Sequence, residues 1–308
     1  MGEPLRVALP PGIGDVHWTC QKLRGLSEYT FGRPIHAYVG ADPSHASVHF
    51  LKLVPFVAQA FQDKEALDAI VYKMPPNHRD QRWSTLEGCA NWQGFDYILV
   101  ANGHLERGER IETWLPEIPT DYTYPLLISD ETKAQMQDLA GVRPTLVYMS
   151  GTGPNIGFHN GWWDVADWVD VVARLNAEGI EPVLIGAANG HDEAYRDWFV
   201  RAGGKRLKYL DLIGQTTHEQ VCALVVDASV WVGLNSGTGI IAAMQGTPTV
   251  MMWSDDRYEV PGAGTVLHRN LKTSWLADEQ LSTYRTLSYG SPELTPENTV
   301  KAMLEVRR

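Results

Sequence analysis

The chain has 308 residues, of which 44% are hydrophobic, so it is long enough for two domains or one large domain with real cores. Its formal net charge of −11 argues against binding to duplex nucleic acid or an anionic membrane through charge alone. Its cysteines lack CxxC spacing, which indicates reduced thiols, a cytosolic compartment and no zinc site (Cys20, Cys89 and Cys222).

The sequence contains no secretion signal and no apolar run of roughly 18 residues. We therefore expect a cytoplasmic protein without a transmembrane segment.

The first predicted strand, Leu5–Leu9, is followed by a loop rich in proline and glycine. A helix is expected over Val16–Leu26, with Asp15 as its N-cap. Because open α/β sheets bind ligands at the carboxyl ends of their strands, Asp15 is a candidate catalytic residue. Capping of the helix alone would explain it equally well.

The first half continues in the same alternating pattern. Strands are predicted over Ile35–Val39, Ala69–Lys73 and Phe95–Ala101, and a bent helix over His45–Phe61. The segment Pro75–Gly94 is polar and rich in tryptophan, as functional loops often are.

A charged and proline-rich segment, Leu105–Tyr124, suits a lid and a crossing between domains. A helix follows over Asp130–Ala140, and the pattern restarts at Pro144. The strand Thr145–Met149 then leads into Ser150–Asn155, a second loop able to approach a phosphate.

The second half alternates strands with helices, which is typical of a doubly wound parallel sheet. After an amphipathic helix opened by Gly161 and two tryptophans, the predicted elements are Ile180–Ile185, a helix with Glu193, Tyr209–Ile213 and the helix Glu219–Asp227.

The most informative stretch is SVWVGLNSGTGIIAAMQGTPTVMMW, Ser229 to Trp253. It predicts the strand Val230–Leu234, a polar turn, the helix Ile240–Gln245 and the strand Thr249–Trp253. Free N–H groups at such a helix N-terminus favour an anion, typically a phosphate. The alternative is that Asn-Ser-Gly only caps the helix.

A further strand is expected over Thr265–His268, and a terminal helix over Thr295–Val306 that folds back onto the first half. We therefore predict a first domain over residues 1–140, a second over 141–290 and a C-terminal helix in 291–308.

The segment GIGDVHWTCQKLRGL resembles the Gly-Asp loop and first helix of glycosyltransferase family 9, the ADP-heptose lipopolysaccharide heptosyltransferases. LIGAANGHDEAY and the stretch from LDLIGQTTHEQ to MMWSDD are similar to the family's C-terminal half. The resemblance implies a GT-B fold, with two Rossmann-like domains. The second would bind a nucleotide-sugar donor and the first an acceptor, either a glycan or another hydroxyl-bearing molecule.

The resemblance also implies roles for single residues. Asp15 matches the catalytic aspartate, which would act as general base in a single inverting displacement without a metal or other cofactor. Glu193 matches a carboxylate that bonds the nucleotide ribose. The donor phosphates would be bound by residues of two turns: Ser150, Gly151, Thr152, Asn235, Ser236, Gly237 and Thr238. The candidates on the acceptor side are Gly14, His17, Trp83 and His104.

The chain departs from the family pattern at three places. Asn160 or Gly161 stands where the family usually has a lysine, Asn235 where it has an aspartate, and Gly239 and Ile240 where it has a histidine. Because charge-assisted hydrogen bonds are the stronger ones, these changes favour an altered donor site. His159 is a candidate substitute for the missing cation.

Three other interpretations stay open at this point. The chain could be a sugar-nucleotide-binding protein without turnover, a sugar-nucleotide epimerase of the same shape, or a transferase acting on a modified nucleobase in DNA. The DNA hypothesis, which is not favoured, would use Arg79, Arg82, Trp83 and Trp92 on a flipped base.

Overall fold

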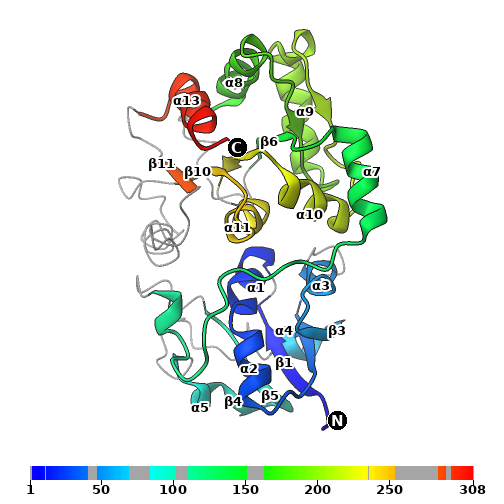
Figure 1. Cartoon of the computed structure of the whole chain (residues 1–308), viewed down its shortest axis with the longest axis vertical. Coiled ribbons are helices and arrows are strands. Elements are labelled where there is room, and N and C mark those ends of the chain that lie inside the picture. The colour runs from blue at the N-terminus through cyan, green and yellow to red at the C-terminus, as the bar shows by residue number, and fades with distance from the viewer. Residues whose placement is uncertain are drawn as a thin grey trace. The chain divides into compact units, whose positions relative to one another are not determined.

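The computed structural model describes residues 2–10, 12–40, 47–68, 84–101, 104, 110–150, 163–234, 236–253, 284–288 and 293–307 (Figure 1). The chain forms two compact units, and it passes from the first to the second between Leu127 and Ile128. The predicted boundary at residue 140 differs because helix α7 (Asp130–Ala140) packs on helix α10 (His218–Asp227) of the second unit. The Ser129 N–H donates to Glu219 Oε1 at 2.9 Å across this contact.

The first unit contains a sheet in the strand order β3-β2-β1-β5-β4. Its strands are β1 (Leu5–Leu9), β2 (Ile35–Val39), β3 (Val57–Gln62), β4 (Ala90–Trp92) and β5 (Phe95–Ile98). Only β4 pairs antiparallel among these strands. Gln93 and Gly94, which join β4 to β5, both have positive φ, as a tight hairpin requires. The predicted loop over Pro75–Gly94 is therefore wrong for residues 86–92, which form a short helix and β4, and its residues 75–83 lie outside the described residues.

The helix predicted over Val16–Leu26 is two helices, α1 (Ile13–Cys20) and α2 (Leu23–Tyr29). The N-cap of α1 is Gly12, whose carbonyl accepts from the Val16 N–H at 2.8 Å. Asp15 is thus inside the first turn and is not the cap. Lys22 lies at the break, where its N–H donates to the Thr19 carbonyl in a tightened last turn.

The bent helix predicted over His45–Phe61 is also wrong. Helix α3 (Ser47–Leu51) ends before Pro55, and the chain continues as strand β3. The residue before a proline is disfavoured in a helix, and the following β-branched and aromatic residues suit a sheet. The strand predicted over Ala69–Lys73 lies outside the described residues. The short helices of this unit are α4 (Lys64–Leu67), α5 (Leu86–Cys89) and η3 (Ile111–Thr113).

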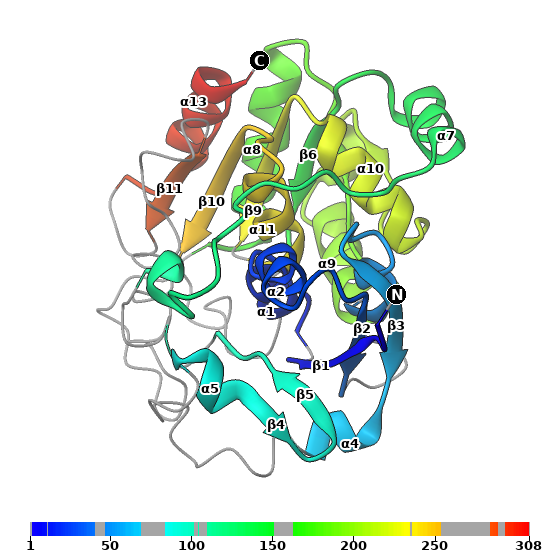
Figure 2. The ribbon, with the colours of Figure 1, turned by 60° about the horizontal axis from the view of Figure 1, so that its bottom comes forward.

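The second unit contains a fully parallel sheet in the order β11-β10-β9-β6-β7-β8 (Figure 2). Its strands are β6 (Thr145–Tyr148), β7 (Val183–Leu184), β8 (Leu210–Asp211), β9 (Val230–Leu234), β10 (Thr249–Trp253) and β11 (Tyr284–Ser288). The sequence predicted β9 and β10 with these bounds. It did not predict β11, and the strand expected over Thr265–His268 lies outside the described residues.

Helices connect these strands, and those that begin at Asp130, His218 and Pro296 start within one residue of the prediction. The helix expected from Gly161 begins at Val165, and the helix expected from Ile240 begins at Gly237. The described helices of this unit are α7, α8 (Val165–Ala177), α9 (His191–Arg201), η5 (Gly204–Arg206), α10, α11 (Gly237–Met244) and α13 (Pro296–Val306). Ser129, Asp164, Thr217, Ser236 and Thr295 each cap a helix by accepting a backbone N–H through the side chain.

The core of the second unit lies between α8 and the sheet. Trp168, Val171, Val172 and Leu175 form a buried stripe on α8, at the spacing of one helix face. The C-terminal helix α13 joins this core through Val300, Met303 and Val306, and it packs on α8. This position in the second unit differs from the predicted return to the first half, because the apolar face of α13 matches the stripe on α8.

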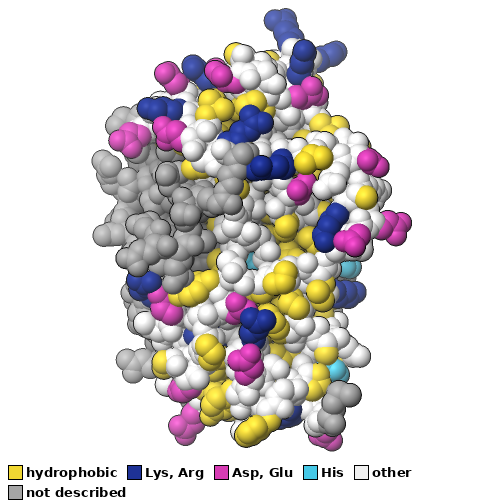
Figure 3. Space-filling model, in the orientation of Figure 1, with side chains coloured by type: hydrophobic (Ala, Val, Ile, Leu, Met, Phe, Trp, Pro, Cys, Tyr) yellow, Lys and Arg dark blue, Asp and Glu magenta, His cyan; other side chains and the backbone are white. Residues whose placement is uncertain are grey.

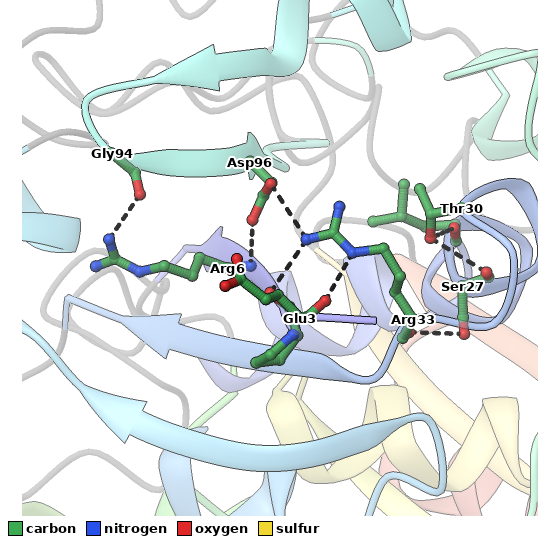
Figure 4. A network of polar contacts seen from close by, with 9 residues as sticks. Glu3, Arg6, Ser27, Thr30, Arg33, Gly94 and Asp96 are labelled. Atoms are coloured by element: carbon green, nitrogen blue, oxygen red, sulfur yellow. Dashed lines mark hydrogen bonds and ion pairs between the residues drawn. The ribbon is translucent and has the colours of Figure 1, made fainter. Parts of the chain in front are cut away.

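The amino-terminal edge of the first sheet is held by a polar network (Figure 4). The Arg6 N–H donates to Asp96 Oδ2 at 2.7 Å, and its guanidinium donates to the Gly94 carbonyl at 2.8 Å. Arg33 donates to the Glu3 carbonyl at 2.7 Å and lies 3.6 Å from Asp96 Oδ1. Asp96 therefore joins β1, β5 and the turn before β2.

We predict that Asp96→Ala lowers the free energy of unfolding of the first unit by about 1–2 kcal/mol, because the Arg6 N–H and Arg33 lose their acceptor. Urea titration followed by circular dichroism measures the effect. Asp138→Ala, at an exposed position on α7, is the matched control and should change stability by less than about 0.5 kcal/mol. Equal effects of the two substitutions would contradict the role of Asp96.

Candidate active site

The strand order of the second sheet reverses between β6 and β9. From β6 the chain moves through β7 to β8, and from β9 it moves the opposite way to β10. Because crossovers between parallel strands are right-handed, α8 and α9 cover one face and α10 and α11 the other. Ligands of open α/β sheets bind where the order reverses, at the carboxyl ends of the strands. Ser150 follows β6, and Ser236 follows β9 at this position.

The turn after β9 presents a helix N-terminus. Ser236 is the N-cap of α11; its Oγ accepts from the Gly239 N–H at 3.3 Å and lies 3.1 Å from Thr238 Oγ1. The Ser236 carbonyl accepts from the Ile240 N–H. The N–H groups of Gly237 and Thr238 then have no partner among the described residues, and at a helix N-terminus they favour an anion.

Close packing holds α11 against the sheet. A Cβ at Gly239 would lie 2.5 Å from the Trp231 ring and 2.7 Å from the Met251 side chain. A Cβ at Gly233 would lie 2.6 Å from the Tyr148 carbonyl of the neighbouring strand. Glycine at both positions lets the helix and strand approach, so the N–H groups at the turn are held by a rigid support.

Ser150, at the end of β6, is hydrogen-bonded to a carboxylate that the sequence analysis did not select. Its hydroxyl donates to Asp192 Oδ1, and the Ala187 N–H donates to Asp192 Oδ2 at 2.6 Å. Ser150 and Asp192 are both 2% exposed. With burial, the charge of Asp192 also raises the pKa of the neighbouring Tyr148 phenol. A hydroxyl has one hydrogen to donate, so the Ser150 side chain is committed to Asp192.

Glu193, the predicted ribose-binding carboxylate, lies in the first turn of α9. Its Oε2 accepts from the Gly190 N–H at 3.1 Å, which satisfies the N-cap N–H of α9, and its Oε1 lies beside Gly214. Glu193 is half-buried, whereas Asp192 is buried. Sequence alone could not separate the two adjacent carboxylates, because both occupy the first turn of a helix after a strand.

The first sheet has the same kind of reversal beside β1. β2 and β3 lie on one side of β1, and β5 lies on the other. The loop after β1 leads to α1, so Asp15 is placed at the carboxyl end of the strand next to the reversal. Its Oδ2 lies 2.6 Å from the position that a Cβ of Gly12 would occupy. The half-buried carboxylate therefore turns back over the N-terminus of α1, whose dipole stabilises a negative charge.

His17, a candidate on the acceptor side, is fully buried. Its Nδ1 is hydrogen-bonded to the Tyr124 hydroxyl at 2.7 Å, and its ring packs edge-on against Phe50 with 5.1 Å between centroids. Burial lowers the pKa of His17 from the usual 6.5 to about 3, so the imidazole is neutral. This geometry places the His17 side chain in the core of the first unit, on the buried side of α1, the helix that also carries Asp15.

The other candidates are placed as follows. His104 is buried, and its Nε2 lies 2.9 Å from Thr113 Oγ1 and 3.1 Å from the Arg110 carbonyl. These contacts tie His104 to residues 110–113. Gly14 lies in α1. Trp83, Gly151, Thr152 and Asn235 lie outside the described residues, as does the candidate His159.

Charges of both signs are mixed on the described part of one face of the molecule (Figure 3). On the face drawn in Figure 3, Lys and Arg side chains alternate with Asp and Glu and form no continuous basic patch over its described part. The described residues also hold no cluster of three metal-ligating side chains. Among the helices in the described part of the chain, none has the length and apolar composition to cross a membrane.

Comparison with known families decides the identity of the fold. Residues 104–283, more than half of the chain, match the family described as glycosyltransferase family 9 (heptosyltransferase). The chain belongs to glycosyltransferase family 9. The expected family and enzyme class are confirmed.

Solved structures of family 9 glycosyltransferases share the fold. Heptosyltransferase II of Escherichia coli, described as an ADP-heptose lipopolysaccharide heptosyltransferase, is 16% identical with a TM-score of 0.64, and 98% of each chain is covered. A family 9 glycosyltransferase from Veillonella parvula is 12% identical with a TM-score of 0.66, over 99% of this chain and 97% of the other. E. coli heptosyltransferase WaaC with ADP is 12% identical with a TM-score of 0.59, over 98% and 100%. The predicted GT-B fold is confirmed.

A search of curated proteins found no match to the chain. Membership of this family does not favour two of the alternative interpretations, namely a binding protein without turnover and a transferase that modifies DNA.

We predict that the Ser150–Asp192 pair is energetically coupled in this glycosyltransferase. Asp192→Ala should destabilise the second unit by about 1–3 kcal/mol, because Ser150 and the Ala187 N–H lose a buried acceptor. Adding Ser150→Ala to Asp192→Ala should cost less than Ser150→Ala alone, giving a coupling energy of about 1 kcal/mol in a urea double-mutant cycle.

The matched control for this cycle is Asp197→Ala, an exposed position on the same helix. Paired with Ser150→Ala it should be additive within about 0.5 kcal/mol. Additivity in the Asp192 cycle as well would show that the two side chains are not coupled.

We predict that His17 makes the stability of the first unit sensitive to acid. In the folded chain the pKa of His17 is lowered to about 3, so its contribution is fully present above pH 6.5 and is lost as the pH falls from 6.5 toward 3. The free energy of unfolding should fall by about 1.4 kcal/mol per pH unit in this range through His17 alone. His17→Asn keeps an acceptor near Nδ1 and should remove this slope in urea titrations at pH 4–7. His191→Asn, at an exposed position on α9, should leave the slope unchanged.

Proposed function

We propose that this family 9 glycosyltransferase is inverting and metal-independent, and transfers a sugar from a nucleotide-diphosphate donor to an acceptor hydroxyl with Asp15 as general base. The observation that carries the proposal is the placement of Asp15 and of the α11 N-terminus beside the two strand-order reversals. In folds of this kind these are the positions at which ligands bind.

The donor diphosphate would be bound at the turn after β9. The free N–H groups of Gly237 and Thr238 and the Thr238 hydroxyl can donate to phosphate oxygens, and the α11 dipole adds a fixed partial positive charge. As the glycosidic bond breaks, negative charge develops on the departing diphosphate. Preorganised donors of this kind stabilise that charge without a metal ion.

Ser150 would contribute differently from the way the family resemblance implies. Because its hydroxyl donates to Asp192, only its backbone N–H could donate to a phosphate. Glu193 would accept from the ribose through Oε1, since Oε2 is used by the Gly190 N–H. Gly151, Thr152 and Asn235 would complete the donor site.

Asp15 would take the proton of the acceptor hydroxyl as this oxygen attacks the anomeric carbon. The displacement forms one bond to the sugar while the bond to the diphosphate breaks, so the configuration inverts. A general base at such a position contributes about 10²- to 10⁴-fold to the rate. Gly12 leaves room for the carboxylate over the N-terminus of α1, where the helix dipole favours a negative charge.

The donor nucleotide can be identified by ligand-induced stabilisation. E. coli WaaC has been solved with ADP and with ADP-2-deoxy-2-fluoro heptose, which makes ADP the first probe. ADP, UDP, GDP, CDP and TDP would be compared by thermal shift. A nucleotide at about 100 times its Kd stabilises the folded protein by about 2.7 kcal/mol. The acceptor we propose is a glycan or another hydroxyl-bearing molecule, because a net charge of −11 disfavours binding to DNA through charge.

We predict that Asp15→Asn keeps the thermal shift given by the stabilising nucleotide but lowers its release from the corresponding sugar nucleotide by at least about 10²-fold. Asn has the size of Asp and cannot accept the proton as a base. Release of the nucleoside diphosphate, with water as acceptor, is measured by a coupled enzyme assay. Asp138→Asn on α7 is the control and should match the unsubstituted chain. Near-full release by Asp15→Asn would remove Asp15 from the mechanism.

A further inference from the structure

Residues 111–127, here called the crossing segment, run along the helices that follow Asp15. Trp114, Leu115 and Ile118 are at most 1% exposed, so the segment belongs to the core of the first unit. At Leu127 the chain passes into the second unit. The segment is thus one covalent connection between the unit that carries Asp15 and the unit that carries the α11 turn.

The crossing segment is attached to α1 by a buried hydrogen bond. Tyr124, 2% exposed, bonds through its hydroxyl to Nδ1 of His17, two residues after Asp15 on the same eight-residue helix. The Tyr124 hydroxyl is also hydrogen-bonded to Cys20 at the end of that helix. The ring of Tyr124 packs edge-on against Phe56, with 5.6 Å between centroids. One phenol therefore contacts α1 in two successive turns.

A second set of hydrogen bonds joins the crossing segment to the break between α1 and α2. Lys22 is fully buried, and its ammonium donates to the carbonyls of Ile118 at 2.8 Å and Leu115 at 3.4 Å. Leu115 has a φ of 49°, a left-handed conformation that residues other than glycine adopt rarely. The Asp121 N–H donates to the Gln21 carbonyl at 2.7 Å beside it.

The packing around these bonds leaves little freedom. A Cβ at Gly25 of α2 would lie 2.3 Å from Ile118 Cγ2 and 2.9 Å from the Pro119 carbonyl. A helix of eight residues moves as one body, so its position at His17 fixes the position of its first turn. Displacement of a reacting group by about 1 Å can cost on the order of 10²-fold in rate.

We infer that Tyr124, acting on His17, and Lys22, acting on the crossing segment, are positioning residues for Asp15. The inference rests on the proposed role of Asp15. None of the three side chains is placed to touch the substrate, because His17, Lys22 and Tyr124 are at most 2% exposed. Their effect is to fix α1, and with it the Asp15 carboxylate, in the position from which the carboxylate would accept the proton of the acceptor hydroxyl.

The test compares Tyr124→Phe, which removes only the hydroxyl, with Tyr29→Phe, an exposed tyrosine at the end of α2. We expect Tyr124→Phe to lower the kcat for nucleoside diphosphate release by about 10-fold or more while the KM for the sugar nucleotide changes less than twofold. Amide hydrogen exchange in residues 13–20 should become faster. Tyr29→Phe should change neither quantity.

A pair of His17 variants separates positioning from simple loss of stability. His17→Asn retains an acceptor for the Tyr124 hydroxyl, and His17→Leu does not. The Asn variant should keep most of the kcat, and the Leu variant should lose it as Tyr124→Phe does, both measured at a temperature at which circular dichroism shows the chains folded. Equal kcat in the two variants, or unchanged exchange in residues 13–20 of Tyr124→Phe, would overturn the inference.

Asp15→Asn measured in parallel distinguishes a failure of the positioning role from a failure of the proposed base. If this variant is inactive and Tyr124→Phe is fully active, only the positioning role is wrong. If Asp15→Asn is itself active, the proposed base is wrong. In that case faster exchange in Tyr124→Phe shows only a structural contact, and the positioning inference is withdrawn with the base.

Discussion

The right-handed connection between parallel strands is the constraint on which both candidate sites depend. In each sheet the chain leaves a central strand in one direction and later continues on the other side of it. Right-handed crossovers then send the helices before and after the reversal to opposite faces, and the loops after the central strands diverge. For this reason the carboxyl ends of β1, β6 and β9, after which Asp15, Ser150 and Ser236 stand, lie beside a reversal of strand order. Residues far apart in the sequence acquire equivalent positions because the connections obey one rule.

The turn after β9 shows how a candidate anion site can be built with few charged side chains. The family usually places a lysine, an aspartate and a histidine around the donor, whereas this chain has neutral residues at the corresponding positions. The described part of the site instead offers backbone N–H groups, hydroxyl groups and a helix dipole. Such donors bind an anion well only if they are held in place. The glycines under α11 and the buried Asp192 supply that rigidity.

The sequence predicted most of the elements whose local signals agree with the fold. Strands β1, β2, β9 and β10 have the expected bounds, and the cap at Thr295 lies where its side-chain chemistry indicated. The failures are tertiary in origin. β3 is a strand because it pairs with β2, and the break at Lys22 is stabilised by carbonyls about 95 residues away. Of two adjacent carboxylates, only packing shows that Asp192 is the buried one.

Lys22 illustrates how such a tertiary feature relates to function. Burial lowers its pKa to about 8, against the opposing effect of Glu112 and Glu117, so at neutral pH the chain keeps an ammonium group in its interior. An unpaired buried charge reduces stability, and an apolar residue of similar volume would pack at least as well. Between pH 8 and the usual 10.5 the folded chain binds fewer protons than the unfolded chain, so this penalty decreases as the pH rises. A group that reduces stability at working pH is best explained by the geometry it imposes. For Lys22 that geometry is the attachment of residues 115–118 to the break between α1 and α2, through which we infer that it positions Asp15.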